Sequence, residues 1–568
     1  MSPTWLERKP DDGKVAELEA AGYPRLLARL LALRGIGSGD EAADFLEPTL
    51  RHLASPLELD RMKEAADEIF AALSAKKQIV VFGDYDCDGV AATAILVKTL
   101  RALEAAADVK AFIPHRIREG FGLSRAAVER MLAEYPKVGL IVTVDNGVNA
   151  PEYIRELEGR GIRCVVTDHH LPGKELPACP VVNPKVGASA ALSEVCGAAV
   201  AFFLASYLVK RAQEAGLYCG PKVSGPLLVL AGLATVTDVM PLMGQNRILV
   251  SQALYLFHKH APVGLRELYA RSTRVATAQP TVKDFGFGLG PRVNAVGRID
   301  DARLALELVL EEGREGARAL AQKVDLKNVE RKAIETKMTA VAKGLIREGA
   351  AAQVIDLKEG HLGVAGIVAA SVMMGLEVPV PVCIIGANRH GSVRAPEGYN
   401  VYEALGECGA ALEVFGGHES AAGLTVKEGE VEHFREMFCA ACRAQWEARG
   451  EAFGARVEFD AELSAADLTL DFVERVMQME PFGHGNEEPV FLMRGVHFKE
   501  VKLFGEEGKH LSVQIVEGGV RAVWWRQGER IEALRKKGAA AHDILFTLSI
   551  SEFEERHVEL WLVDISDC

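Results

Sequence analysis

The 568-residue sequence lacks an apolar run long enough to cross a membrane. Its longest such stretch, residues 226–240, contains two threonines and an aspartate and is shorter than the ~20 residues that a transmembrane helix needs. The first nine residues also lack the basic-then-apolar layout of a secretory signal. We therefore expect no contact with membranes and a cytoplasmic location.

Cysteine is sparse, with ten residues scattered along the chain. Cys439 and Cys442 have the two-residue spacing of zinc and redox motifs, but no second Cys or His pair follows them nearby. Because Phe434, Met437 and Trp446 accompany them on a helical pattern, buried helical thiols are the better interpretation and a zinc or redox site the alternative. A reducing compartment fits this cysteine usage.

The chain also lacks a basic excess, because 65 Lys and Arg face 79 Asp and Glu, giving a net charge of −14. This argues against indiscriminate nucleic-acid binding, which usually shows as a basic domain. A confined positive stripe stays open, since local charges determine the field in a groove. With 49% hydrophobic and 25% charged residues the composition is globular, and the length predicts about three or four domains.

What the sequence does contain is a group of closely spaced acids. Directly after the apolar run 79–82, Asp84, Asp86 and Asp88 occupy alternate positions in a loop that ends in Gly89. The pattern predicts a buried strand that delivers three carboxylates to the carboxyl end of a sheet, where open α/β sheets bind ligands. Crowded anions repel one another unless a cation lies between them, so a hard divalent metal is the favoured interpretation. A solvated acidic turn, the alternative, would not need such a strand before it.

Further apolar runs end in acids or imidazoles: residues 138–144 before Asp145, residues 164–167 before Asp168, His169 and His170, and residues 227–236 shortly before Asp238. Helical stretches at 91–105 and 150–159 are long enough to connect the first three runs as right-handed crossovers. For a lone histidine a satisfied core residue would be the simpler interpretation, but not for a tandem pair. Four acid-bearing ends therefore predict one metal site on a parallel sheet.

In order, these segments read GDYDCDG, TVDNGV, TDHH and VTDVMPL, and they resemble the four motifs of the DHH phosphoesterase superfamily. Later segments resemble the RecJ family of bacterial single-strand-specific exonucleases within it: PRVNAVGR at 291–298, GSVR at 391–394, GGHESAAG at 416–423 and PFGHGN at 481–486. The resemblance extends from about residue 33 to the C-terminus. It implies a metal-dependent 5′-to-3′ exonuclease that hydrolyses single-stranded DNA in repair and recombination.

The resemblance implies a catalytic set around the metals, namely Asp86, Asp88, Asp145, His169, His170, Asp238 and Arg298. Asp86 would bind one ion, Asp88 the other, and Asp145 both. His169 and Asp238 would complete the second ion. A mixed carboxylate and imidazole set suits two ions of Mn²⁺ or Mg²⁺ better than zinc.

The remaining site residues would act around these ions. Asp84 would supply a further ligand or orient one, Asp168 would fix the tautomer of a histidine, and His170 would face the phosphate. Substrate-binding positions implied by the resemblance are Arg116, Arg292, Arg298, Ser392, Arg394 and His418. Of these, Ser392 and Arg394 with Arg116 would hold the 5′-terminal phosphate. For the two arginines of PRVNAVGR, exposed side chains on a helix-capping turn are the alternative.

The expected fold class is α/β: a parallel-sheet DHH domain, a long connecting helix, a second α/β DHH-associated domain and a C-terminal OB-like β-barrel. The corresponding ranges are 1–75 (N-terminal helical segment), 76–313 (DHH metal-binding catalytic domain), 314–350 (connecting helix), 351–450 (DHH-associated substrate-binding domain) and 451–568 (OB-like nucleic-acid-binding domain and tail). In the second α/β domain we expect strands at 354–357, 382–385 and 423–426.

Two parts of this organisation give more specific expectations. In the connecting helix Ile334, Met338, Val341 and Leu345 repeat at helical spacing, with charged side chains such as Arg331 facing out. In the barrel we expect strands at 497–503, 510–516 and 520–524, and only one exposed side chain of the pair Trp524 and Trp525. Lys502, Lys509, His510, Arg521 and that tryptophan would face single-stranded DNA.

Two other functions stay open at this stage. The first is a DHH phosphodiesterase for short RNA oligomers or cyclic dinucleotides, although such enzymes usually lack the long helix and the barrel. The second is a non-catalytic replication scaffold, but such proteins tend to have lost metal ligands and none is missing here. The expected partners are single-stranded DNA, a helicase and a single-strand-binding protein, with the chain itself a monomer.

Overall fold

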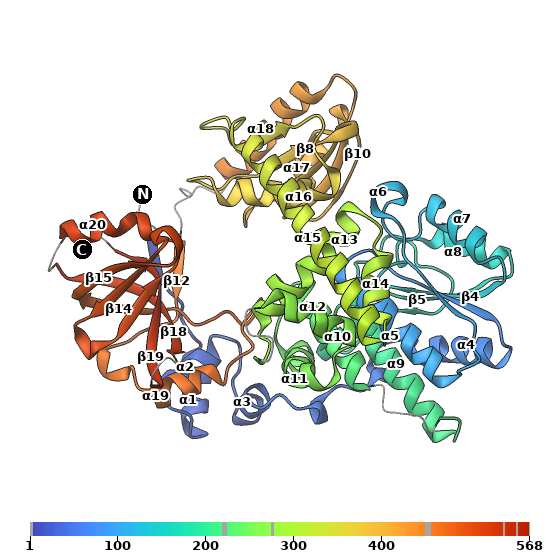
Figure 1. The fold of residues 1–568 in the computed structure, drawn as a ribbon, viewed down its shortest axis with the longest axis horizontal. Coiled ribbons are helices and arrows are strands. Elements are labelled where there is room, and N and C mark those ends of the chain that lie inside the picture. Colours follow the sequence, from blue (N-terminus) through green and yellow to red (C-terminus); the bar gives the residue numbers. More distant parts are fainter. Residues whose placement is uncertain are drawn as a thin grey trace. The chain divides into compact units, whose positions relative to one another are not determined.

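The computed structural model describes residues 4–218, 224–273, 278–448, 456–537, 540–551 and 555–566 (Figure 1). The chain divides into two compact units. Unit 1 contains Met1–Leu53, Pro241–Ser251 and Gly454–Cys568, and unit 2 contains Ala54–Met240 and Gln252–Phe453. Within the described residues no helix is long and apolar enough to span a bilayer. The domain limits expected from the sequence stay a prediction, since one compact unit can contain several domains.

The first sheet of unit 2 is parallel, with the strand order β3-β2-β4-β5-β6. Its strands are β2 (Gln78–Phe82), β3 (Val109–Phe112), β4 (Val138–Val144), β5 (Arg163–Thr167) and β6 (Val181–Val182). The three apolar runs that were expected to be strands are therefore confirmed. Val144 of β4 pairs with Thr167 of β5, and Thr143 pairs with Phe82 of β2. This register brings the carboxyl ends of β2, β4 and β5 to one edge.

Helices cover both faces of this sheet. One face packs against α7 (Arg125–Glu134) and α8 (Pro151–Gly159), and the other contacts α4 (Met62–Ser74), α5 (Cys87–Leu103) and α9 (Gly197–Glu214). The helices expected at 91–105 and 150–159 are confirmed as α5 and α8. The short helix α6 (Arg116–Glu119) follows β3, and α10 (Ser224–Thr237) packs on α5 and α9. Asp238 therefore follows a helix end, unlike the other acids.

A helical region leads from this sheet to the next: α11 (Gly244–His260), α12 (Val263–Ser272), a π-helical turn at Asp284–Leu289, α13 (Gly290–Ile299), α14 (Arg303–Leu310) and the 30-residue α15 (Arg314–Lys343). The long connecting helix is confirmed, and it packs on α12, α13 and α14 along its length (Figure 1). The expectation that Arg331 faces solvent is wrong, because it is only 8% exposed and donates to Asn328 and Glu335. Val341 and Leu345, expected on the apolar face, are 52% and 49% exposed, because the end of the helix packs on α16 through Met338 and Ala342 instead.

The second sheet of unit 2 has the order β10-β11-β9-β8-β7. Its elements are β7 (Gln353–Asp356), β8 (Val382–Ile385), β9 (His390–Arg394), β10 (Leu412–Gly417) and β11 (Ala421–Val426), with helices α16 (Leu362–Met374), α17 (Val401–Glu407) and α18 (Val431–Ala448). The expected strands are confirmed as β7, β8 and β11. Cys442 is buried and Cys439 half-buried in α18, and both are free thiols, as expected.

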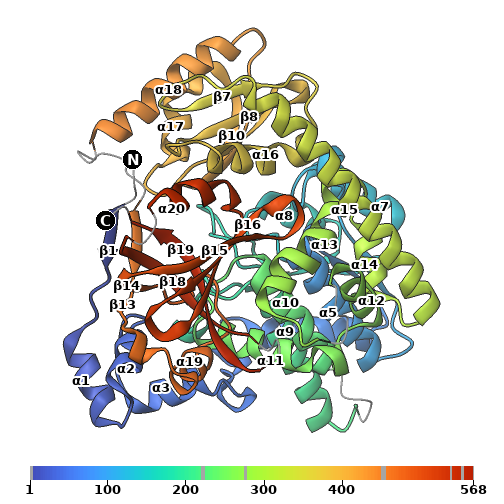
Figure 2. The ribbon, with the colours of Figure 1, turned by 60° about the vertical axis from the view of Figure 1, so that its left-hand side comes forward.

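Unit 1 has a seven-stranded sheet in the order β13-β14-β18-β19-β17-β16-β15 (Figure 2). The strands are β13 (Ala461–Glu462), β14 (Phe491–Val496), β15 (Phe498–Phe504), β16 (His510–Ile515), β17 (Arg521–Trp524), β18 (His542–Ser551) and β19 (His557–Ile565). The three expected barrel strands are confirmed as β15, β16 and β17. Trp524 is 4% exposed and Trp525 is 45% exposed, so the expectation of one exposed tryptophan is also confirmed.

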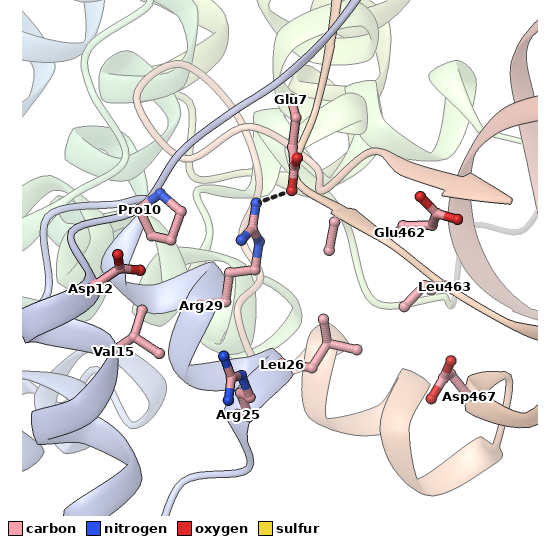
Figure 3. A pocket seen from close by; sticks show the side chains of 11 residues that line it. Glu7, Pro10, Asp12, Val15, Arg25, Leu26, Arg29, Glu462, Leu463 and Asp467 are labelled. Carbon is pink, nitrogen blue, oxygen red and sulfur yellow. Dashed lines mark hydrogen bonds and ion pairs between the residues drawn. The ribbon is translucent and has the colours of Figure 1, made fainter.

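Helices from both ends of the chain complete the core of unit 1: α1 (Asp12–Ala20), α2 (Arg25–Ala32), α3 (Gly39–Leu46), α19 (Leu470–Met477) and α20 (Ile531–Lys537). The strand β1 (Thr4–Glu7), which the sequence analysis did not predict, pairs in parallel with β12 (Arg456–Phe459). Glu7 of β1 lines a cavity of about 440 Å³, in which Arg29 donates to Glu7 at 2.7 Å. Figure 3 shows the side chains that line this cavity. The charge of Arg29 is thus balanced by Glu7 within the cavity.

Candidate active site

Of the three acids after β2, two are buried and the third, Asp86, is half-buried at the start of α5. Asp84 is 1% exposed and Asp88 is 2% exposed. Asp86 caps α5, because its Oδ1 accepts from the backbone N–H groups of Asp88 and Gly89 at 3.0 Å. A Cβ on Gly89 would lie 2.6 Å from the backbone of Asp84, so only glycine allows the helix to begin this close to the strand. The alternation of acids in this loop therefore turns two of them inward and makes the third a helix cap.

Asp88 lies at the amino end of another helix. Its two carboxylate oxygens accept from the backbone N–H groups of Gly197 and Ala198, the first residues of α9, each at 2.8 Å. The positive end of a helix dipole favours a negative side chain there. A Cβ on Gly197 would fall 2.7 Å from Cβ of Asp145, so this glycine lets α9 approach both acids. Asp88 is thus fixed in position by two backbone N–H groups.

Asp145 and Asp238 converge on His169. His169 Nε2 is 3.1 Å from Asp145 Oδ1, and 3.6 Å from both Asp88 Oδ2 and Asp238 Oδ2. Asp145 has a φ of 60°, a left-handed conformation that aspartate tolerates better than most residues. The ends of two strands and two helices therefore meet at one imidazole, as the sequence predicted for the acid-bearing ends.

The donor atoms of this group fit a divalent cation. Three overlapping sets have ligand atoms within 4.8 Å of one another: Asp84, Asp86 and Asp145; Asp88, His169 and Asp238; Asp145, His169 and His170. Buried carboxylate oxygens normally accept hydrogen bonds. Within the described part of the chain, however, Asp84 Oδ1, Asp145 Oδ1 and Asp238 Oδ2 are buried and accept none. Oxygens of this kind fit a hard divalent cation.

The electrostatics of the cluster agree with this assignment. Burial and neighbouring carboxylates raise the pKa values of Asp84, Asp86 and Asp145, and the same causes raise the pKa of Asp238 to about 9. Burial lowers the pKa of His169, which keeps its imidazole in the neutral form that binds metals. Negative charge is thus costly here until positive charge is added.

His170 differs from His169, because a neighbouring carboxylate, that of Asp168, raises its pKa. Its Nδ1 lies 2.7 Å from Oδ1 of Asp168, which is 2% exposed in its side chain. Burial opposes a charge on His170, but the hydrogen bond and the charge of Asp168 outweigh it and raise the pKa to about 9. The same bond overcomes burial at Asp168 and lowers the pKa of that carboxyl. His170 is therefore an imidazolium at neutral pH, beside the neutral His169.

Three arginines of unit 2 lie near the metal cluster, and we call them the arginine cluster: Arg116, Arg298 and Arg394. Burial and then the charges of the other two lower the pKa of Arg298 to about 10, so these guanidinium groups repel one another. Arg394 donates to Ser392 Oγ at 3.3 Å, and a Cβ on Gly366 of α16 would lie 2.7 Å from Arg394 Nη2. Concentrated positive charge of this kind fits a phosphate.

Two predicted substrate-binding residues have other surroundings. Arg292 donates to Asp325 of α15 at 2.8 Å and to the carbonyl of Gly288, which ties α13 to the long helix. His418 is exposed on the β10–β11 hairpin. Across the described ranges no hydrogen bond or ion pair links either residue to the metal cluster or the arginine cluster. The structure thus assembles most of the predicted set, without these two.

Sequence reasoning missed two residues of the site. Asn294 Oδ1 accepts from the backbone N–H of Cys87 at 2.7 Å, so PRVNAVGR also braces the acid loop. Phe121 is 52% exposed, and its ring centroid lies 5.4 Å from that of His170 and 6.4 Å from that of Tyr85. The motif could have pointed to Asn294, but no periodicity or spacing marks Phe121. An apolar ring beside an imidazolium offers a stacking surface to a base.

Three family models match separate parts of the chain. The DHH family N-terminal domain matches residues 78–229, the DHHA1 domain matches 349–444, and the RecJ OB domain matches 459–564. They correspond to the first sheet, the second sheet and the seven-stranded sheet.

Similar proteins match nearly the whole chain. The single-stranded-DNA-specific exonuclease RecJ of Dickeya dadantii is 35% identical over 538 residues, covering 91% of each chain. The Bacillus subtilis protein of that name is 32% identical over 563 residues, covering 97% of this chain and 69% of its own length. Among solved structures, RecJ of Thermus thermophilus in complex with Mn²⁺ has a TM-score of 0.82 at 30% identity, covering 100% of this chain and 80% of that chain. The same protein in complex with Mg²⁺ has a TM-score of 0.77.

Proposed function

The chain belongs to the RecJ family of single-stranded-DNA-specific exonucleases, and from this premise we propose that it removes nucleotides from the 5′ end of single-stranded DNA with two Mn²⁺ or Mg²⁺ ions. The observation that carries the proposal is the group of buried carboxylate oxygens without hydrogen bonds around His169. Asp84, Asp86, Asp88, Asp145, His169 and Asp238 would hold the ions. When bound, such ions supply Lewis-acid polarisation of the phosphodiester and activation of water.

The protein's own residues would position the charges that the reaction needs. The start of α9 holds the carboxylate of Asp88 in place, and the cap on α5 holds that of Asp86. Asp168 keeps His170 protonated, so this imidazolium can stabilise negative charge that develops on the phosphate. Asn294 holds the acid loop through Cys87, which limits the movement of all these groups.

The arginine cluster supports recognition of a strand terminus. Three guanidinium groups with few carboxylate partners favour a doubly charged terminal phosphate over the single charge of an internal phosphodiester. Ser392 adds a hydroxyl beside Arg394. A bound 5′-phosphate here would direct the first phosphodiester toward the metal cluster, and Phe121 would stack on a nearby base. The 5′-to-3′ direction is therefore part of the proposal.

The experiment is the degradation of single strands blocked at the 5′ or the 3′ end, with Mn²⁺ and with EDTA. We expect release of mononucleotides only from strands with a free 5′ end and only with metal. Asp145→Asn, which keeps the side-chain shape and removes one charge, should lower kcat by roughly a thousandfold or more, since metal ions contribute several kcal/mol. Degradation from a free 3′ end, or activity confined to dinucleotides, would contradict the proposal.

The biological setting extends the same proposal. Work in DNA repair and recombination requires single strands, which a helicase would produce and a single-strand-binding protein would cover. We propose that the chain acts as a monomer with these partners, in the cytoplasm. Size-exclusion chromatography with light scattering tests the oligomeric state.

A further inference from the structure

The loop 481–486, which carries the motif PFGHGN, takes no part in the site described above. Within unit 1, this loop contacts a segment that is distant in the sequence, residues 241–251. The backbone N–H of Leu242 donates to the carbonyl of His484 at 2.7 Å. Gly485 has a φ of +73°, and a Cβ there would lie 3.1 Å from Cβ of Pro241. We call 481–486 the clasp loop and 241–251 the held segment.

Asn486 gives the clasp loop its shape. Its side chain is fully buried, and its Nδ2 donates to the carbonyls of Met479 and Pro481, both at 2.9 Å. Its Oδ1 accepts from Nε of Arg34 at 2.6 Å. The amide is therefore satisfied on both sides, and a fully satisfied buried amide makes a loop rigid.

Arg247 fixes the held segment from the other side. It is 1% exposed, and its guanidinium donates to the carbonyls of Phe45, Met479 and Glu480 at 2.6, 2.8 and 2.6 Å. The same group lies 3.9 Å from the centroid of the Phe45 ring. A buried cation is costly to move away from such partners, because no water would replace them. The held segment is thus anchored both to α3 and to the residues just before the clasp loop.

The held segment begins three residues after Asp238. Helix α10 ends there in a Schellman arrangement: the N–H of Val239 donates to the carbonyl of Val236 at 3.2 Å, and the N–H of Met240 donates to the carbonyl of Thr235 at 3.1 Å. Val239 has a φ of 56°, at the position where glycine is usual. For a β-branched residue this conformation is strained, and a side chain that is 64% exposed recovers little of the cost by burial. The two hydrogen bonds of the helix end hold this turn, and Pro241, the first residue of the held segment, follows it directly.

We propose that the clasp loop and Arg247 are positioning elements for the metal centre, because by fixing Pro241 they fix the helix end that directs Asp238 toward His169. The inference rests on the proposed function of that centre. Only Val239 and Met240 separate the candidate ligand from the held segment, so the chain between them has little freedom. Arg247 and the clasp loop touch no reacting group and act through Asp238.

The test compares two glycines of unit 1 in the full-length protein. Gly485→Ala adds a methyl group against Pro241, whereas Gly495→Ala adds one at a φ of +64° with nothing within 4 Å. Both variants bear the same kind of cost, that of alanine in a left-handed conformation. Mn²⁺ binding is measured by calorimetry without DNA, together with Tm. We expect Gly485→Ala to weaken Mn²⁺ binding about tenfold, the low end for partners that orient a ligand, and Gly495→Ala to leave it unchanged.

A second variant protects the test against misfolding. Asn486→Asp keeps the side-chain size and the contact with Arg34, but removes both N–H donors to Met479 and Pro481. It should weaken Mn²⁺ binding in the same direction. Unchanged Mn²⁺ affinity in a folded Gly485→Ala or Asn486→Asp protein, or equal loss in Gly495→Ala, would overturn the inference. If the unaltered protein binds no Mn²⁺, the proposed function fails instead.

Discussion

Replacing Arg247 with methionine should destabilise unit 1 strongly. Methionine fills part of the volume but removes the guanidinium donors of three carbonyls, of which that of Met479 keeps Asn486 Nδ2 as a donor, and it removes the cation from the face of Phe45. Burial lowers the pKa of Arg247 to about 9, so the group is still charged at pH 7 and its bonds are charge-assisted. Breaking such a buried arrangement typically costs about 3–5 kcal/mol, and we expect a loss in that range.

Tryptophan fluorescence during urea unfolding measures this loss. Four of the five tryptophans, at positions 5, 524, 525 and 561, belong to unit 1, so the signal reports mainly on that unit. The matched control is Arg556→Met, because Arg556 is exposed and pairs with Glu474 at 2.5 Å. An exposed pair contributes about 0–1 kcal/mol, so the control should unfold nearly like the unaltered protein. A loss below about 1 kcal/mol for Arg247→Met, no larger than that of an exposed pair, would refute the reasoning.

Three further predictions concern unit 2. In metal-free protein, the free energy of unfolding should fall as pH rises from about 6.5 to 9. The pKa values of Asp238 and His170 are raised to about 9, so in this range the folded state holds protons that the unfolded chain has released. Thermal unfolding across this range should show the fall, and saturating Mn²⁺ should remove the part due to Asp238. Asp168→Asn should lower the pKa of His170, since burial then acts unopposed. The alkaline limit of the kcat/KM profile should therefore move down by about one pH unit or more. An unmoved limit would show that a group other than His170 determines the loss of activity at high pH. Phe121→Ala should raise KM for single-stranded DNA by at least about fivefold with little change in kcat, since stacking on one ring contributes about 1–3 kcal/mol. The control Tyr255→Ala, which removes an exposed ring on α11, should leave KM unchanged. Equal effects of the two substitutions on KM would contradict the stacking role of Phe121.

The strands that carry the acids could be predicted because a parallel sheet leaves a clear local signal. Each of its central strands is buried on both faces, so it appears as a short run of β-branched residues that ends where the polar loop begins. Asp84, Asp145 and His169 closely follow such runs. Since all parallel strands end at one edge, their convergence followed from local patterns alone.

Features that depend on distant partners could not be predicted in this way. Arg331 looked like an exposed helical charge, but Asn328 and Glu335 are arranged so that it is buried. Strand β1 exists only because β12, which begins at Arg456 near the other end of the chain, accepts it as a neighbour. The clasp loop has no charge pattern, and its role depends on a contact with Leu242. In each case the signal lies in the pairing and in neither segment alone.

The composition of unit 1 from three separate stretches has a consequence during protein synthesis. Every proposed metal ligand has left the ribosome once residue 240 is exposed, but the last stretch of unit 1 begins 214 residues later, at Gly454. At about 5–20 residues per second, elongation over this interval takes roughly 10–40 s. During that time the nascent chain carries its acids without the loop that anchors Pro241. Nuclease competence would thus be delayed until translation is nearly finished, and prematurely terminated products would bind Mn²⁺ poorly.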